Sequence, residues 1–207
     1  MEPDTTVRAD EAVPNDTTVR TDGPPPPGPG RDLLDGHRAR TGTEEADLAR
    51  IRALAALPDP WDRALPLHLT GSAIVVHPPT RRVLLRLHPR VGSWLHVGGH
   101  GDPGESHPRA VALREAAEET ALPDLRFWPG PDLLHAVVVP VPAGGDEPAH
   151  EHADLRYVLA TNLPERARAE TPDAPLRWLP LPEAHDQVAV GDLRESLARL
   201  EPLLGPC

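Results

Sequence analysis

The sequence predicts an α/β fold built on a mixed β-sheet. Three observations carry this prediction: β-branched apolar runs of strand length begin near residue 67, a segment with helical periodicity follows a glycine pair, and a second helical segment closes the chain. Strands and helices in this order favour a sheet covered by helices over a helical bundle. A chain of 207 residues allows one domain with appendages and a sizeable buried core.

The N-terminal part is expected to lie outside this domain. Residues 1–30 contain the repeated segments DTTVRAD and DTTVRTD and end in a proline and glycine tract. Such a segment has little apolar surface to bury, so we expect a disordered tail.

Residues 31–63 are expected to form a helical N-terminal extension. Apolar side chains recur at helical spacing over residues 43–57, with Thr43 as the expected N-cap and prolines after the last turn. The side chains of this stripe are Leu48, Ile51 and Leu54.

Residues 64–207 are expected to form the main domain. Its predicted strands share apolar, β-branched residues bounded by proline, glycine or polar turns. They cover residues 67–77, 82–88, 93–97, 133–141, 154–161 and 176–181. The segment 133–141 is strongly apolar, so we expect it in the centre of the sheet. Helices are predicted at 108–120 and from Asp192, where Glu195 completes an apparent capping box.

Composition narrows the function classes. The formal net charge is -11, with 32 acidic residues against 21 basic ones, all of them arginine, which argues against binding to duplex nucleic acid. No apolar run reaches the about 20 residues that span a bilayer, and the first residues lack signal-peptide features. We therefore expect a cytoplasmic protein without membrane partners. Cys207 is the single cysteine, which excludes an internal disulfide and a zinc-thiolate site.

Residues 98–122, GGHGDPGESHPRAVALREAAEETAL, are the most informative stretch. On a helix, Glu115, Glu118 and Glu119 stand at i, i+3 and i+4 and share one face. Three carboxylates this close repel one another. A protein tolerates that repulsion readily only where the carboxylates face open water or surround a cation. Mg²⁺ or Mn²⁺ suits such oxygen ligands, although an acidic run can also be an ordinary solvated helix face.

This stretch resembles the signature box of the Nudix hydrolases, GX5EX7REUXEEXGU, where U is bulky and aliphatic. Gly99, Glu105 and Arg114 match its fixed positions, as do the glutamates that follow. Two departures stand out: eight residues rather than seven separate Glu105 from Arg114, and Ala121 replaces the last glycine. The resemblance covers about residues 64–204 and implies the Nudix α/β/α sandwich.

The resemblance also implies an activity, the hydrolysis of a nucleoside diphosphate linked to another group X by water attack on phosphorus. It implies Mg²⁺ or Mn²⁺ ligands at Glu115, Glu118 and Glu119, joined by the backbone carbonyl of Gly99. Arg114 would orient a glutamate, with Glu105 and Glu118 as the candidates. The group X stays open among nucleoside triphosphates, ADP-ribose, nucleotide sugars, dinucleoside polyphosphates and coenzyme A.

The general base has several candidates. Glu118 is our choice within the box. Glu147 and Glu151 are the candidates outside it, in the expected loop before residues 154–161, where an acidic residue is commonly just solvated.

Histidines and aromatic residues supply further candidates. His100, His150 and His152 could bind a metal or the substrate, or else form exposed loop groups or a local hydrogen-bond network. Trp94 and Tyr157 could stack on a nucleobase, but large aromatic residues on strands also commonly fill a core.

Two other functions compete with hydrolysis. A catalytically weak Nudix-fold module that binds nucleotides or regulates other proteins is one alternative, although such modules usually lose box glutamates that are intact here. An isomerase on the same fold is the other, but its chemistry relies on an active-site cysteine and Cys207 is the final residue. A homodimer stays open.

Overall fold

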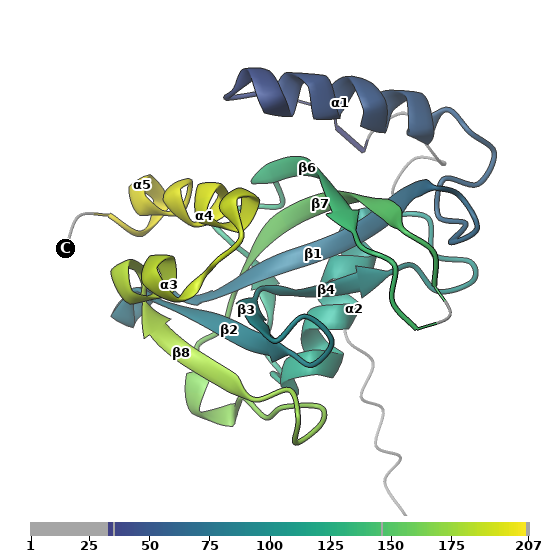
Figure 1. Cartoon of the computed structure of the whole chain (residues 1–207). Coiled ribbons are helices and arrows are strands. Elements are labelled where there is room, and N and C mark those ends of the chain that lie inside the picture. Colours follow the sequence, from purple (N-terminus) through teal and green to yellow (C-terminus); the bar gives the residue numbers. More distant parts are fainter. Residues whose placement is uncertain (1–32, 35, 146, 206–207) are drawn as a thin grey trace, which may run out of the picture.

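The computed structural model describes residues 33–34, 36–145 and 147–205. The predicted tail at 1–30 and Cys207 lie outside these residues. Figure 1 shows one twisted sheet with helices packed on both sides. The mixed sheet and the α/β/α sandwich are therefore confirmed, and no helix in the described part of the chain is long and apolar enough to cross a membrane.

A single sheet contains all the described strands. They are β1 (Leu67–His77), β2 (Arg82–His88), β3 (Ser93–Leu95), β4 (Val97–His100), β5 (Arg126–Phe127), β6 (His135–Val141), β7 (His150–Ala160) and β8 (Leu176–Pro180). The main path runs β3-β2-β1-β7-β5, with β4 beside β1, β6 beside β7 and β8 beside β2. The long strands β1 and β7 are parallel, and the other pairs are antiparallel.

The helices cover the two faces of this sheet. They are α1 (Gly42–Ala55), α2 (Pro108–Thr120), α3 (Leu181–Gln187), α4 (Gly191–Ala198) and α5 (Glu201–Leu204). Helix α1 confirms the predicted N-terminal helix, but its N-cap is Thr41 rather than Thr43, because the Thr41 hydroxyl accepts the Glu44 N–H at 3.1 Å. Two short 3-10 helices, at Pro78–Thr80 and Pro164–Arg166, were not predicted.

Alternate residues of β1 feed two separate cores. Leu69 and Ala73 pack in one cluster with α1 and α2. Ile74 and Val76 pack in the other, with α3 and α4. Gly71 lies against α2 so closely that an added Cβ would stand 2.5 Å from the Pro108 carbonyl oxygen. The glycine therefore lets the box helix rest directly on the central strand.

The most apolar strand is at an edge, not in the centre as predicted. Strand β6 pairs with β7 alone, and β7 lies between β1 on one side and β5 and β6 on the other. Helix α1 covers the edge: the Asp47 carboxylate accepts the Val138 N–H at 3.1 Å, and the Glu44 carboxylate accepts the Ala136 N–H at 3.3 Å. Coverage by α1 explains why an edge strand can be so apolar.

Three local predictions were also wrong. The predicted strand at 93–97 is divided into β3 and β4, and β4 continues through Gly98 and Gly99, which pair with Ser72 and Gly71 of β1. Strand β7 begins at His150, so the expected loop before residue 154 is already part of the sheet. The apparent capping box at Asp192 does not form, because α4 begins one residue earlier without a side-chain cap.

Candidate active site

Helix α2 presents the box residues. His107 is its N-cap and accepts the Arg109 N–H at 3.2 Å, and Pro108 occupies the first turn. The extra residue between Glu105 and Arg114 is absorbed here, before the first helical turn. The helix therefore keeps its predicted bounds, and Arg114 still reaches Glu105.

Arg114 joins the carboxylates of the box. Its guanidinium donates to Glu105 at 3.0 Å, to Glu115 at 3.1 Å and to Glu118 at 2.8 Å. It also donates to the backbone carbonyl of His100 at 2.8 Å. The predicted partners Glu105 and Glu118 are thus both contacted. Burial opposes ionisation of Glu105, but the hydrogen bonds from Arg114 hold the pKa of Glu105 below its usual value.

Glu115 lies directly against the glycine pair of β4. A Cβ added at Gly99 would stand 2.6 Å from the carboxyl carbon of Glu115, so a larger residue at position 99 would push this carboxylate aside. Burial raises the pKa of Glu115, and the neighbouring Arg114 counteracts part of that rise. Gly99 and Glu115, predicted from the box to act together, are therefore in contact.

Glu119 is the most buried of the box glutamates. Its carboxylate accepts the Gly98 N–H at 3.0 Å and pairs with Arg86 of β2 at 3.1 Å. Burial nevertheless raises the pKa of Glu119 to about 7. A buried carboxylate with so high a pKa is ionised at a cost, and a cation beside it would offset that cost.

The donor chemistry of α2 fits a hard divalent cation. Glu115 and Glu119 offer carboxylate oxygens at positions i and i+4, and each electrostatically disfavours ionisation of the other. Two groups of three His, Cys, Asp or Glu side chains within the described residues bring ligand atoms within 4.8 Å of one another, and neither contains a box glutamate. Glu118 instead points to Arg114 and is the most exposed of the box glutamates.

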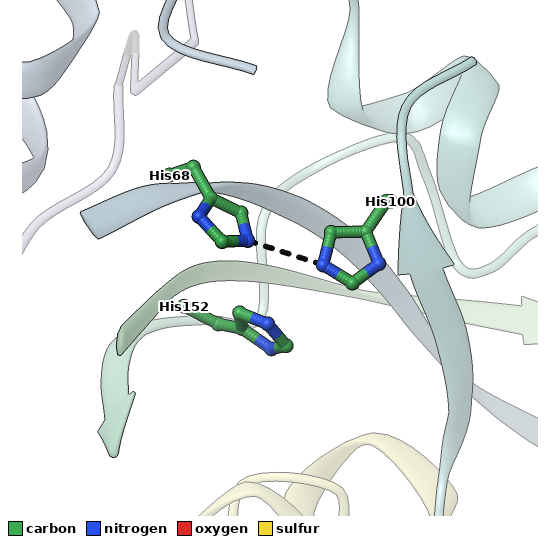
Figure 2. A group of neighbouring side chains, drawn as sticks. All are labelled: His68, His100 and His152. Carbon is green, nitrogen blue, oxygen red and sulfur yellow. Dashed lines mark hydrogen bonds between the residues drawn. The ribbon is translucent and has the colours of Figure 1, made fainter. Parts of the chain in front are cut away.

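One of those two groups consists of histidines at the open end of the sheet. Figure 2 shows His68 of β1, His100 of β4 and His152 of β7 converging from three strands. The Nε2 atoms of His68 and His100 are 3.1 Å apart, and those of His150 and His152 are also 3.1 Å apart. Burial lowers the pKa of His100 to about 3 and of His152 to about 4, so both are neutral near pH 7.

Burial also lowers the pKa of His68, which the sequence interpretation did not single out. The parallel register of β1 and β7 places His68 directly opposite His152. The sequence signal was available: polar residues alternate along β1 at positions 68, 70 and 72 and along β7 at positions 152, 154 and 156.

These alternating residues form a buried polar network beyond the histidines. Asp154 accepts hydrogen bonds from Thr70 at 3.0 Å, Ser72 at 2.7 Å and Arg156 at 2.7 Å. Burial opposes its ionisation, but Arg156 beside it holds the pKa of Asp154 well below its usual value. His96 contacts the same carboxylate at 3.3 Å. The network fixes the register of β1 against β7 next to the histidines.

The remaining predicted residues do not join either group of ligands. Glu147 pairs with Arg90, and Glu151 lies on β7 and pairs with Arg50. Tyr157 is buried in the core, with its ring against that of Phe127, so of its two predicted roles the structure shows core packing. Trp94 lies on β3, where the guanidinium of Arg177 stands 5.1 Å from its ring centre.

Comparison with known proteins agrees with this geometry. A sequence model of the NUDIX domain matches residues 67–200, which is more than half of the chain. The chain therefore belongs to the Nudix family, and it is a Nudix-type hydrolase. No curated protein sequence matches it significantly.

Solved structures with a similar fold include other hydrolases. A C. elegans Ap4A hydrolase superposes with a TM-score of 0.52 and 18% identity, covering 66% of this chain and 98% of that chain. The E. coli dihydroneopterin triphosphate pyrophosphohydrolase gives a TM-score of 0.47 and 18% identity, covering 65% of this chain and 94% of that chain. At this level of identity the likeness of the C. elegans structure concerns the fold alone.

Proposed function

We propose that this Nudix hydrolase cleaves the diphosphate linkage of a nucleoside diphosphate derivative in the presence of Mg²⁺ or Mn²⁺. The observation that carries the proposal is the contact of Glu115 with Gly99, beside the buried Glu119 and the ion pairs of Arg114. This arrangement gathers carboxylates that are hard to ionise where the box resemblance expects a cation.

The residues that would hold the cation are Glu115 and Glu119, with the backbone carbonyl of Gly99. The box resemblance adds Glu118, which here has one carboxylate oxygen paired with Arg114. A bound divalent cation supplies screening of the charge that develops on the phosphate oxygens. Gly99 allows this approach because any larger residue would collide with Glu115.

Glu118 is the proposed general base. Its side chain is about half exposed, with 53% of its surface accessible, so water can reach it. It accepts the proton of the attacking water as the oxygen of that water bonds to phosphorus, and the bond from phosphorus to the leaving oxygen breaks. Arg114 orients Glu118 through their contact at 2.8 Å. Glu105 in turn fixes Arg114 from the other side.

The test is product release from a panel of nucleoside triphosphates, ADP-ribose, nucleotide sugars and dinucleoside polyphosphates. The dinucleoside polyphosphates belong in it because the C. elegans hydrolase of similar fold is an Ap4A hydrolase. We expect cleavage of one class with Mg²⁺ or Mn²⁺ and none with chelator. Glu118→Gln and Glu119→Gln are each expected to lower turnover by orders of magnitude while the protein stays folded.

The alternative is a Nudix-fold module that binds nucleotides without cleaving them. Folded protein that binds a nucleotide of the panel but cleaves none would favour this alternative. Near-normal turnover in both glutamine variants would overturn the cation assignment instead.

A further inference from the structure

Two of the histidines at the open end of the sheet are oriented by backbone carbonyl groups, as metal-binding histidines commonly are. His68 Nδ1 lies 3.0 Å from the Leu65 carbonyl oxygen, and His150 Nδ1 lies 2.9 Å from the Pro148 carbonyl oxygen. A carbonyl can only accept, so each Nδ1 carries a proton, and the neutral form of each ring has its lone pair on Nε2. Metal-binding histidines are typically oriented by this kind of backbone contact.

Both lone pairs point at another histidine. His68 Nε2 faces His100 Nε2, and His150 Nε2 faces His152 Nε2, each at 3.1 Å. Two imidazole nitrogens bound to one tetrahedral zinc ion at about 2.0–2.1 Å lie about 3.3–3.4 Å apart. The observed spacing therefore needs only a small outward shift to accommodate an ion.

The four rings form one compact cluster. The ring centre of His68 is 5.1 Å from that of His100, 5.2 Å from that of His150 and 5.0 Å from that of His152. His68 is 1% exposed and the other three histidines are half-buried, so the cluster extends from the surface into the protein. Four imidazoles gathered without a carboxylate among them suit zinc, copper or nickel, and not magnesium.

We propose that His68, His100 and His152 bind one Zn²⁺ ion at a site separate from the box carboxylates, and that His150, whose Nε2 lies 3.1 Å from that of His152, moves in as the fourth ligand. The ligands come from β1, β4 and β7, so the ion links three strands (Figure 2). A cavity of about 290 Å³, lined by His68, His100 and His150 together with Arg63, gives the ion a path from solvent.

The site is linked to the box through one residue. His100 contributes its ring to the histidine cluster, and its backbone carbonyl accepts the Arg114 N–H at 2.8 Å. An ion that fixes His100 therefore also fixes the end of β4 against which Arg114 is placed. Zinc thus has a positioning role here and takes no part in water attack.

The other histidine-containing group does not compete as a metal site. Glu44, His135 and Glu195 also bring ligand atoms within 4.8 Å of one another. Both oxygens of Glu44, however, already accept hydrogen bonds from Arg199 at 2.8 Å. A guanidinium is thus already seated where a metal ion would have to bind.

The experiment uses the full chain without a histidine tag, freed of metal by dialysis against a chelator. Zn²⁺ is titrated by calorimetry, and Co²⁺ is followed by the visible absorption bands of a tetrahedral complex. We expect one ion per chain, and we expect excess Mg²⁺ not to displace it. No nucleotide is present, so the outcome does not depend on the proposed hydrolysis.

Variants separate a built site from casual binding. His152→Ala and His68→Ala are each expected to weaken Zn²⁺ binding by at least about 100-fold, because even outer contacts to such ligands are worth about 10–100-fold. His150→Ala changes the more accessible ligand and guards against misfolding of the variant at buried His68. The matched control is His77→Ala, a histidine of the same strand β1 that contacts Thr80 instead.

Failure of the folded wild type to bind Zn²⁺ saturably would overturn the site. Binding that is equally strong in His77→Ala and in the His68 and His152 variants would identify an adventitious ion and overturn it as well. Displacement of Zn²⁺ by Mg²⁺ at matched concentration would show that the ion belongs to the box and not to the histidines.

Discussion

Replacement of Glu119 by glutamine is expected to stabilise the metal-free protein while it abolishes activity. Glu119 is 8% exposed, and burial raises its pKa from 4.5 to about 7. The charged groups that act on it are Arg86, Glu115 and Glu170. Arg86 favours the ionised form, and the two carboxylates oppose it. The net result of burial and neighbours is a folded state that prefers the neutral carboxyl.

The direction and size of the pH effect follow from linkage. Because the folded pKa exceeds the unfolded one, the folded protein retains a proton that the unfolded chain has released. Stability is therefore lost as the pH rises from 4.5 to about 7, and the loss is complete above about 7. An interval of about 2.5 pH units at about 1.4 kcal/mol per unit corresponds to about 3 kcal/mol. Glutamine resembles the protonated form and avoids this loss.

The assay is thermal unfolding in chelator from about pH 5 to about pH 8, where about 3 kcal/mol corresponds to a shift on the order of 5–10 °C in a chain of this size. Glu119→Gln is expected to melt with the wild type near the acid end and above it at the alkaline end. Mg²⁺ should reduce the difference in melting temperature between the variant and the wild type, because it binds and stabilises the wild type. Glu165→Gln, at an exposed glutamate, is the matched control. Equal melting temperatures of Glu119→Gln and wild type throughout would refute the reasoning.

Three further substitutions probe α2 and its partners. Ala121, the C-cap, has φ of 53°, so Ala121→Gly should raise the melting temperature by a few degrees (about 0.5–1 kcal/mol) without changing kcat. The control Ala117→Gly, inside the helix, should lower the melting temperature. A large gain in kcat of Ala121→Gly would contradict this prediction. Gly99→Ala should displace Glu115 and lower turnover far more than stability, and unchanged turnover would argue against their contact. Arg114→Lys should lower kcat by about 100-fold in a folded protein, because a lysine cannot hold three carboxylates at once. An unchanged kcat in this variant would show that Arg114 does not orient the glutamates.

Local signals were enough to locate several elements from the sequence. Residues 67–77, 82–88 and 108–120 were predicted with the bounds that the structure shows. Prolines mark most of their ends, and each has the periodicity of its own element, so no knowledge of distant partners was needed. The contact of Arg114 with Glu105 was also predictable, because the family resemblance supplies it.

Pairing between distant strands was not predictable in the same way. Both β6 and β7 are apolar, and the sequence alone does not say which of them is flanked on two sides. The answer depends on α1, whose Asp47 and Glu44 accept N–H groups of β6 and so let it stand at the edge. Apolarity thus reports burial of a strand, and burial under a helix gives the same pattern as burial between strands.

The histidine cluster could have been located from the alternation of polar and apolar residues along one strand. Along β1, His68, Thr70 and Ser72 are polar, while the residues between them are apolar or glycine. In a surface strand such alternation marks the solvated face. Here all three side chains are at most 5% exposed, so the polar face is turned inward and must find partners. Thr70 and Ser72 donate to Asp154 of β7, whereas His68 contacts the Leu65 carbonyl through Nδ1 and another histidine through Nε2. The row of polar side chains thus satisfies each hydroxyl with a carboxylate and ends in four imidazoles whose Nε2 atoms face one another in pairs. The proposed zinc ion would replace those contacts between imidazoles with bonds to the metal.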